Sequence, residues 1–554
     1  MREWICKRSR WLIFLSFLLL SFLSLYIVYF QNGHILIGDD YHFHQNRIEG
    51  LAQSLAHGIW LPKISYFFIG GYGYASSLFY PDFYLYIPAL LRVAGFSLAT
   101  SFLFFATMIN LGTFGITYLS GRIMGLPKLK SYLFSLLYTL SIYRLQDFFN
   151  RQAIGELLAM GFFPLVLASL SLLKAGKVQN WWLLTIAMTG IGLAHFISLE
   201  IVSIFIGLYV LLNARRFVKK QTLTALLKAT IVTILLLAFY LVPVFEQMSR
   251  ITFQVTANPL TLISDRSYAL GELLANSFEN RVFHASSANI GLILLVGLLV
   301  NGVMLFKQKN VDRDLLFLSF LFMFMTTNLF PWQLFDQTPL NTIQFPWRFL
   351  SIVTLLSAYL IANDYNKILK KIPYGQGILI LFILLGVVIY EWESIDTEGK
   401  RIVSHQSYDQ TNSYYIGAGH EYLPKEVNYQ KLLKNKKREI SYDPEVMTIK
   451  KSELSFASVS FDYQVALSKP AIVTLPFIYY YGYQAKVIED GKVKEIPAVL
   501  NKQNGYVALS LSGKGKVTVS YKTTWAQKIS LSISLITLAP LFSVKVVPYI
   551  SKKF

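Results

Sequence analysis

A group of residues suited to acid–base chemistry follows the first apolar run of the chain. Two adjacent carboxylates, Asp39 and Asp40, precede His44 and Arg47. A carboxylate beside a membrane surface can act as a general base or hold a divalent metal ion. If residues 43–57 form a helix, His44 and Arg47 share a face of it. Alternatively, Asp39 or Asp40 only caps the start of that helix.

Further charged and polar residues stand at the ends of later apolar runs. Arg151 and Glu156 flank one such boundary, where charged residues are either paired with each other or functional. Arg348 follows Gln344 at the start of another run, and its guanidinium either snorkels to the interface or binds a phosphate through its planar fork. His195 lies at a turn between two further runs.

A glycine- and tyrosine-rich stretch follows the acidic pair and ends at Tyr80 and Asp82. Its glycines, Gly70, Gly71 and Gly73, neither follow a strand nor open a helix, so the stretch is not a dinucleotide-binding loop. Tyrosine rings at a membrane interface are commonly belt residues, and they also contact sugars and lipid headgroups. Tyr80 and Asp82 are therefore candidate substrate contacts.

The elements that must position these residues are membrane-spanning helices. Of the 554 residues, 54% are hydrophobic and only 15% are charged. Apolar runs of roughly 20 residues can cross a bilayer, and in lipid such runs must be helical. The net charge of +20 does not indicate nucleic-acid binding, because Lys and Arg gather in short loops between apolar runs. The single cysteine, Cys6, excludes an internal disulfide and a Cys-based metal site.

The loops that carry these basic residues predict the topology. If each basic loop is cytoplasmic, about twelve spans alternate across the membrane, with both termini inside. The first apolar run lacks a small-residue cleavage motif and is interpreted as an uncleaved signal anchor. The basic residues include Lys174, Arg216, Lys309, Lys370 and Lys371 and those of the tail beyond 545. The spans are placed near 11–30, 99–121, 131–147, 154–173, 180–194, 196–213, 223–245, 288–306, 313–330, 347–363, 374–391 and 526–545.

Two large segments lie on the outer side in this topology. The first, 31–98, contains an apolar stretch, 83–91, that is too short to span and is interpreted as a juxtamembrane or re-entrant helix. The second, 392–525, is polar, and Asp490-Gly491 within it is a hairpin-turn dipeptide. Strands are predicted at 454–465, 471–481, 485–489, 493–499, 506–511 and 517–521. The predicted domains are thus a multispan unit (1–391), a mainly β domain (392–525) and a last helix with a basic tail (526–554).

Seven of the polar residues fall on the outer side under a topology that was derived without them: Asp40, His44, Arg47, Arg151, Glu156, His195 and Arg348. We expect one polar cavity at the outer leaflet that combines acidic, imidazole and guanidinium groups. Such a cavity suits a substrate with a phosphate in the headgroup region and a long tail in lipid.

Six stretches of the sequence occur as motifs in order: 38–50, 70–81, 151–156, 344–348, 417–424 and 480–483. Together they resemble the bacterial YfhO-like membrane proteins. These proteins carry a domain labelled 6-pyruvoyl-tetrahydropterin synthase related. The resemblance covers nearly the whole chain, including the β domain and the closing span. More broadly, the layout is similar to the GT-C glycosyltransferases, multispan enzymes that use sugars carried on polyprenyl phosphate.

The resemblance implies a glycosyl-transfer site on the outer face of a bacterial cell membrane. Asp40 matches the first-loop acid, with Asp39 as the second candidate. Arg348 or Arg151 would hold the lipid phosphate, and His44 and Glu156 would orient the acid. Asp40, His44 and Glu156 could hold a divalent Mg or Mn ion. The implied partners are a lipid-linked sugar donor, an envelope polymer or glycan acceptor and membrane lipid, with no nucleic acid.

Two other functions stay open. A transporter or flippase of lipid-linked glycan should carry charges or broken helices at mid-span, and the charges here stand at span ends. A non-catalytic envelope scaffold, whose β domain binds glycan or protein, is the other alternative. Asp40, Arg151 and Arg348 should face one cavity if the chain is a transferase.

Overall fold

The chain forms two compact units, each assembled from segments that are far apart in the sequence. Unit 1 comprises 1–41, 97–234 and 261–410, and unit 2 comprises 42–96, 235–260 and 411–554. The computed structural model describes residues 2–29, 34–283, 287–307, 312–368, 373–394, 402–434, 437–466 and 469–541. Lys309, Lys370, Lys371 and the basic tail therefore lie outside the described residues. The three-part domain division predicted from the sequence stays a prediction.

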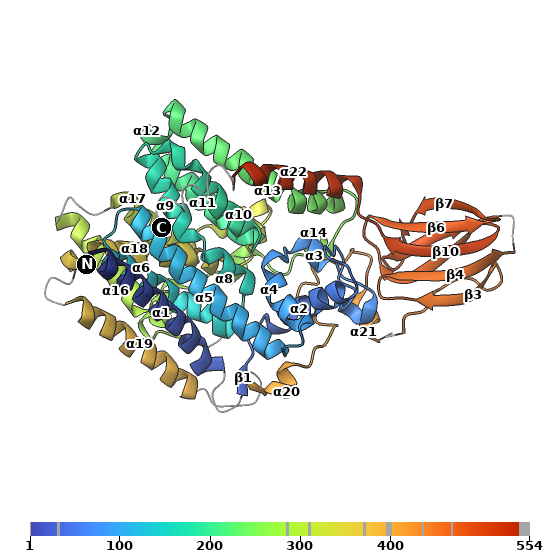
Figure 1. Ribbon diagram of the computed structural model, residues 1–554, viewed down its shortest axis with the longest axis horizontal. Helices are drawn as coiled ribbons and strands as arrows, with labels where there is room; N and C mark the ends of the chain where they lie inside the picture. The colour runs from blue at the N-terminus through green and yellow to red at the C-terminus, as the bar shows by residue number, and fades with distance from the viewer. Residues whose placement is uncertain are drawn as a thin grey trace. The chain divides into compact units, whose positions relative to one another are not determined.

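Unit 1 is built from helices that coincide with the apolar runs. In Figure 1, α1, α5 and α6 lie side by side, and Phe17 of α1 stacks on Phe114 of α5 with ring centres 4.9 Å apart. The longer helices are α1 (Arg2–Tyr29), α5 (Leu98–Ile123), α6 (Lys128–Thr139), α9 (Phe163–Lys174), α10 (Trp181–Gly192), α11 (Phe196–Leu212), α16 (Leu292–Lys307), α17 (Arg313–Met325), α18 (Leu350–Ile368) and α19 (Tyr374–Ser394). The shorter ones are α7 (Ile142–Gln146), α8 (Ile154–Met160), α12 (Ala214–Phe217) and α15 (Leu270–Phe278).

Helices long and apolar enough to cross a membrane occur at three places in the described part of the chain: Leu98–Ile123, Ile154–Lys174 and Lys220–Met248. Shorter apolar helices stand at other predicted spans, so the apolar, largely helical character of the chain is confirmed. The number of twelve spans and their orientation stay predictions. The predicted span 131–147 is not one helix, because the chain breaks between α6 and α7 and then widens into a π-turn.

Strand β1 (His34–Leu36) pairs antiparallel with β2 (Ile402–Ser404), with Ile35 opposite Val403. Both strands belong to unit 1. The pairing joins the start of the first predicted outer segment to the start of the second. It also fixes the chain immediately before Asp39 and Asp40.

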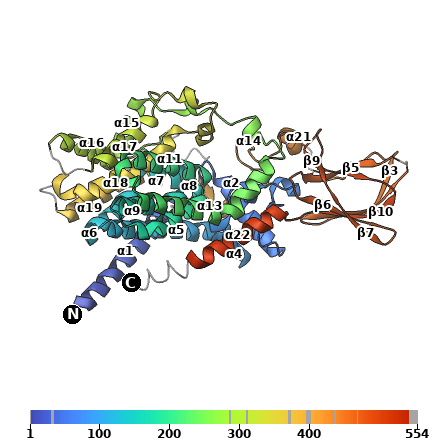
Figure 2. The same cartoon turned by 90° about the horizontal axis from the view of Figure 1, so that it is seen from above.

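Unit 2 contains the predicted strands as two antiparallel sheets. The five-stranded sheet has the order β3-β4-β10-β6-β7, which Figure 1 shows across the sheet, and the three-stranded sheet has the order β5-β9-β8. Figure 2 shows the sheets as two layers. The strands are β3 (Met447–Leu454), β4 (Ser458–Val465), β5 (Ala471–Ile478), β6 (Tyr483–Glu489), β7 (Lys492–Pro497), β8 (Val499–Leu500), β9 (Tyr506–Leu511) and β10 (Lys514–Tyr521).

Alternating side chains explain why these two sheets face each other. The buried positions of β5 and β9, such as Phe477 and Leu509, share one apolar core with Phe461 and Val517 of the larger sheet. The hairpin predicted at Asp490-Gly491 is confirmed, because Glu489 pairs with Lys492 and both turn residues have positive φ, 46° and 77°.

Helices from earlier in the chain complete unit 2. Its main helices are α2 (Tyr41–Ala56), of which Tyr41 belongs to unit 1, α4 (Tyr86–Val93), the second half of α13 (Lys220–Met248) and α22 (Trp525–Leu541). The predicted helix at 83–91 is present as η3 (Phe83–Leu85) followed by α4. Its placement at a membrane surface stays a prediction.

Candidate active site

A bend in the chain after α7 holds the backbone of the acidic pair, Asp39 and Asp40, in place. The π-turn η4 (Asp147–Arg151) ends at Gln152, whose φ of 53° is left-handed, and α8 begins two residues later. Backbone carbonyls freed by such a turn need donors. The amide of Asp39 donates to the carbonyl of Asn150 at 3.0 Å, and the amide of Asp40 donates to that of Arg151 at 2.8 Å. The bend therefore binds the Asp39–Asp40 backbone directly.

Gly38 permits this close approach. A Cβ added there would lie 2.8 Å from the carbonyl carbon of Arg151 and 2.9 Å from the amide nitrogen of Gln152. The side chain of Gln152 also donates to the carbonyl of Leu36 at 3.1 Å. The segment from Leu36 to Asp40 is thus held against the segment from Asn150 to Gln152, both in unit 1.

Glu156 is the centre of a buried ion cluster. Arg151 pairs with it at 3.0 Å and with Asp147 at a shorter distance, and Tyr143 donates its hydroxyl to Glu156 at 2.5 Å. The side chains of Glu156 and Asp147 are only 3% and 1% exposed. Buried carboxylates of this kind persist only when they are paired, so Arg151 is required by both.

Arg348 joins the cluster from the start of η9 (Pro346–Phe349), just before α18. Its Nε lies 3.7 Å from Glu156, and its Nη1 donates to the carbonyl of Ile343 at 2.7 Å and to Gln344 at 3.4 Å. Within the described part of the chain, Nε is a buried donor with no hydrogen-bond partner. Arg348 therefore keeps unused donor capacity, whereas Arg151 bridges two carboxylates.

Aromatic rings cover the two guanidinium groups. The Arg151 guanidinium lies 4.3 Å from the ring centre of Trp347, and that of Arg348 lies 5.0 Å from the ring centre of Phe345. The two rings stack at 5.3 Å. Cations are held against aromatic faces by the ring quadrupole. The sequence Phe345-Pro-Trp-Arg348 thus supplies one cation, Arg348, and also the ring of Trp347 against which the second cation, Arg151, packs.

Asp40, like its neighbour Asp39, is a member of this site that solvent can reach. Its side chain is exposed, yet protein surrounds it closely enough that burial raises its pKa above the ordinary 3.8. Arg151 and Arg348 lower the pKa of Asp40, and Asp39 and Glu156 raise it, by smaller amounts. Asp40 is therefore an accessible acid in the electrostatic field of two guanidinium groups. A carboxylate with a raised pKa is suited to accept a proton.

His195 and Glu200 lie in the same unit. His195 stands at the start of α11, forms a hydrogen bond between its Nδ1 and Ser198 at 2.8 Å, and acts electrostatically on Glu156. Glu200 accepts a hydrogen bond from Thr342 at 2.7 Å. The described structure thus gathers Asp39, Asp40, Arg151, Glu156, His195, Gln344 and Arg348, all predicted from the sequence, in unit 1.

The other predicted residues form a second set in unit 2. Arg47 pairs with Asp82 at 2.8 Å, lies over the Tyr80 ring at 3.8 Å, and has its Nη1 3.4 Å from Nδ1 of His44. The Arg47 side chain is only 2% exposed. Arg47 thus contacts all three of the others inside unit 2, and it forms an ion pair with Asp82. That both sets line one cavity stays a prediction.

Sequence reasoning missed some members of the cluster. Tyr143, Asp147 and Trp347 contact it through their side chains, and Arg144 beside them is completely buried. Arg144 donates to the carbonyl of Leu157 at 3.3 Å and to Thr113 at 3.3 Å. A charged pair near the end of the predicted span 131–147 was the available signal.

The expected metal ion has no fitting set of ligands in the described residues. No three His, Cys, Asp or Glu side chains there gather closely enough to hold an ion. Glu156, one proposed ligand, already accepts from Tyr143 and pairs with Arg151. The Mg or Mn ion stays a prediction.

These features define the class: a membrane protein with apolar helices that enclose a buried ion cluster. Residues 78–395 match the family described as "6-pyruvoyl-tetrahydropterin synthase related domain; membrane protein", and this match covers more than half of the chain. The chain belongs to that family. The match includes Arg151, Glu156 and Arg348, while Asp40 lies before it. Comparison with curated proteins gives no match.

Two solved structures show distant similarity. The arabinofuranosyltransferase AftD from Mycobacteria is 14% identical, with a TM-score of 0.45, over 70% of this chain and 27% of AftD. ArnT from Cupriavidus metallidurans, solved bound to undecaprenyl phosphate, is 13% identical, with a TM-score of 0.40, over 70% of this chain and 63% of ArnT. The chain spans about a quarter of AftD and less than two thirds of ArnT.

Proposed function

We propose that the protein is a membrane glycosyltransferase that moves a sugar from a polyprenyl-phosphate donor to a cell-envelope acceptor. The observation that carries the proposal is the solvent-exposed Asp40 in the field of Arg151 and Arg348, with its backbone fixed to the carbonyl of Arg151. Sugar transfer from a lipid phosphate needs a carboxylate that accepts the acceptor's proton and a nearby cation that stabilises the leaving phosphate. The site would lie on the outer face of a bacterial cell membrane, following the charge distribution of the loops.

Asp40 is the proposed general base. The acceptor hydroxyl transfers its proton to Asp40 while its oxygen attacks the anomeric carbon of the donor. The bond from that carbon to the lipid phosphate breaks, and the bonding electrons leave with the phosphate. The raised pKa of Asp40 supports this role, because a stronger base accepts the proton more readily.

Arg348 is the proposed phosphate ligand. Its Nε faces Glu156 at 3.7 Å without a hydrogen bond to any described residue, so the guanidinium has a donor that a phosphate oxygen could take over if the side chain turned toward it. Stabilising the leaving phosphate would lower the barrier, because its negative charge grows in the transition state. Arg151 is proposed to position Asp40, since its Nη1 pairs with both Asp147 and Glu156 and its carbonyl accepts from the Asp40 amide.

Analysis of envelope glycans tests the proposal. Cells that carry wild-type protein, Asp40→Asn or Asp39→Asn are compared by mass spectrometry of their envelope glycans and lipid-linked sugars. Asp39→Asn is the matched control, because it removes the same charge one residue away. We expect Asp40→Asn to lose one glycan modification and to accumulate its lipid-linked donor, while Asp39→Asn retains it.

Identical profiles in all three strains, at equal amounts of protein in the membrane, would refute the base role of Asp40. Loss of the modification with lipid-linked donor trapped on the cytoplasmic face would indicate a transporter instead.

A further inference from the structure

A second polar site lies in unit 1, away from the candidate active site. It is a pocket of about 480 Å³ at the ends of α9, α11 and α12. Its charged lining residues are Lys174, Arg216, Lys219 and Asp312. Three cations thus face one anion in a hollow that is large enough for a small headgroup.

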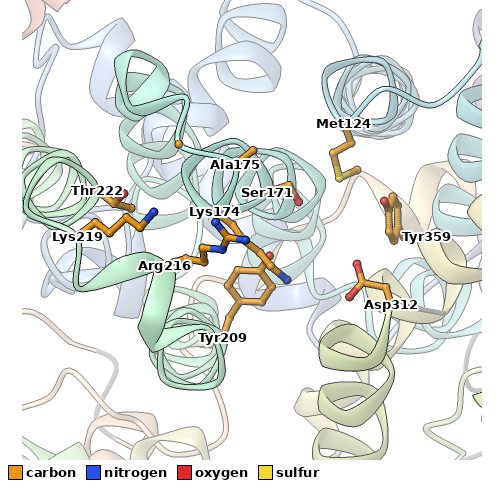
Figure 3. Close-up of a pocket in the computed structure, with 11 residues that line it drawn as sticks. Met124, Ser171, Lys174, Ala175, Tyr209, Arg216, Lys219, Thr222, Asp312 and Tyr359 are labelled. Carbon is orange, nitrogen blue, oxygen red and sulfur yellow. The ribbon is translucent and has the colours of Figure 1, made fainter. Parts of the chain in front are cut away.

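Two of the three cations are free to bind a ligand. Lys174 pairs with Asp314 at 2.6 Å and lies 5.6 Å from the ring centre of Tyr209. Arg216 and Lys219 are exposed, and the side chain of neither forms an ion pair or hydrogen bond with any residue that the structure describes. Figure 3 shows Lys219 and Arg216 extending from one wall toward Lys174, with Asp312 on the opposite side.

The pocket and the ion cluster lie at opposite ends of the apolar segment that α8 and α9 form. Glu156 stands in the first turn of α8, and Lys174 is the last residue of α9 in the apolar segment Ile154–Lys174. Eighteen residues of helix extend about 27 Å, close to the thickness of a bilayer core. If the ion cluster faces the outer leaflet, the pocket faces the cytoplasmic one, where the positive-inside rule places basic residues.

The geometry points to a binding site for the phosphate group of an anionic phospholipid in the cytoplasmic leaflet. Basic pockets between membrane helices on that side hold such headgroups. Arg216 offers a planar fork and Lys219 a point charge to phosphate oxygens, and the hydroxyl of Thr222 also lines the pocket. This inference does not depend on the proposed glycosyltransferase activity.

Native mass spectrometry of the full chain in detergent tests the inference. Cardiolipin, phosphatidylglycerol and phosphatidylethanolamine are titrated separately onto wild type and onto Arg216→Gln/Lys219→Gln. We expect wild type to bind the two anionic lipids in preference to the zwitterionic one. Each lost charge should weaken anionic-lipid binding about fivefold, so the double variant should bind roughly 25-fold more weakly.

Arg215→Gln/Lys220→Gln is the matched control, because it removes the same charges from exposed neighbours that do not line the pocket. It should bind almost as wild type does. A further variant, Asp312→Asn, removes the anion of the pocket and should tighten binding. Misfolding cannot imitate that gain.

Equal losses in the two double variants would overturn the inference, since they would indicate a diffuse basic surface. Equal binding of phosphatidylethanolamine would overturn it as well. Titration with inorganic phosphate distinguishes the source of the ligand. If phosphate binds to wild type and both anionic lipids do not, the site takes a soluble phosphate compound, and the assignment to a lipid is wrong.

Discussion

Arg47 is expected to stabilise unit 2 rather than to contact a substrate. Its Nη2 donates to Asp82 at 2.8 Å and to the backbone carbonyls of Tyr80 and Pro81 at 3.1 and 2.9 Å. The Asp82 side chain is only 10% exposed. The substitution Arg47→Gln would leave that carboxylate without its cation and two carbonyls without their donor.

The expected loss of stability is large. Removing one partner of a buried ion pair costs about 3–5 kcal/mol, and at roughly 2–4 °C per kcal/mol for a domain of this size the melting temperature of unit 2 should fall by about 6–20 °C. Arg92→Gln is the control, because Arg92 pairs with Glu49 at 2.9 Å but the two side chains are 25% and 17% exposed. A pair that water reaches from both side chains is worth about 1 kcal/mol or less, so this shift should stay below roughly 4 °C.

Limited proteolysis of the full chain in detergent, at a series of temperatures, measures the unfolding of unit 2. Fragments from the strands β3 to β10 report when that unit opens. If Arg47→Gln and Arg92→Gln open at the same temperature, the reasoning is refuted, and the place in a substrate cavity that the sequence predicts for Arg47 becomes the better explanation.

Three further predictions concern the candidate active site. Gly38→Ala should push Asp40 away from Arg151 and reduce sugar transfer by about 100-fold, whereas Gly112→Ala, where a Cβ meets nothing within 4 Å, should transfer normally in the same assay. Because folding raises the pKa of Asp40 above 3.8, its ionisation costs stability, so stability should fall as pH rises above that value. Asp40→Asn should therefore melt at a higher temperature than wild type at neutral pH and not at pH 3.5, and a lower melting temperature at neutral pH would contradict this. Arg348→Lys keeps the charge but loses the planar fork, so the KM for the donor should rise about tenfold or more in initial-rate measurements, and an unchanged KM would remove Arg348 from donor binding.

The elements of the fold that local patterns encode could be predicted from the sequence. Apolar runs place helices because every backbone amide must be bonded within its own segment in lipid. The dipeptide Asp490-Gly491 places a hairpin because both residues accept positive φ. The π-turn at 147–151 escaped prediction, since no Gly or Pro marks it and it is stabilised by distant contacts such as that of Asn150 with Asp39.

Pairing between distant side chains was harder to predict. Arg151 and Glu156 are five residues apart, and their pairing was one of the two alternatives that the sequence left open. The pair of Arg47 with Asp82 joins α2 to a loop 35 residues later, and nothing local in the sequence indicates it. Composition and the charge pattern predict that the polar groups share one side of the membrane, but they could not say which charges neutralise each other.

The central claim is that Asp40 is the base of a sugar transferase. The most direct measurement is the release of polyprenyl phosphate by purified protein that is given polyprenyl-phosphate sugars and envelope acceptors. Wild type should release polyprenyl phosphate together with a glycosylated acceptor, with a rate that falls at acid pH as Asp40 takes up its proton, and Asp40→Asn should release neither product. Equal release by Asp40→Asn and wild type would contradict the account.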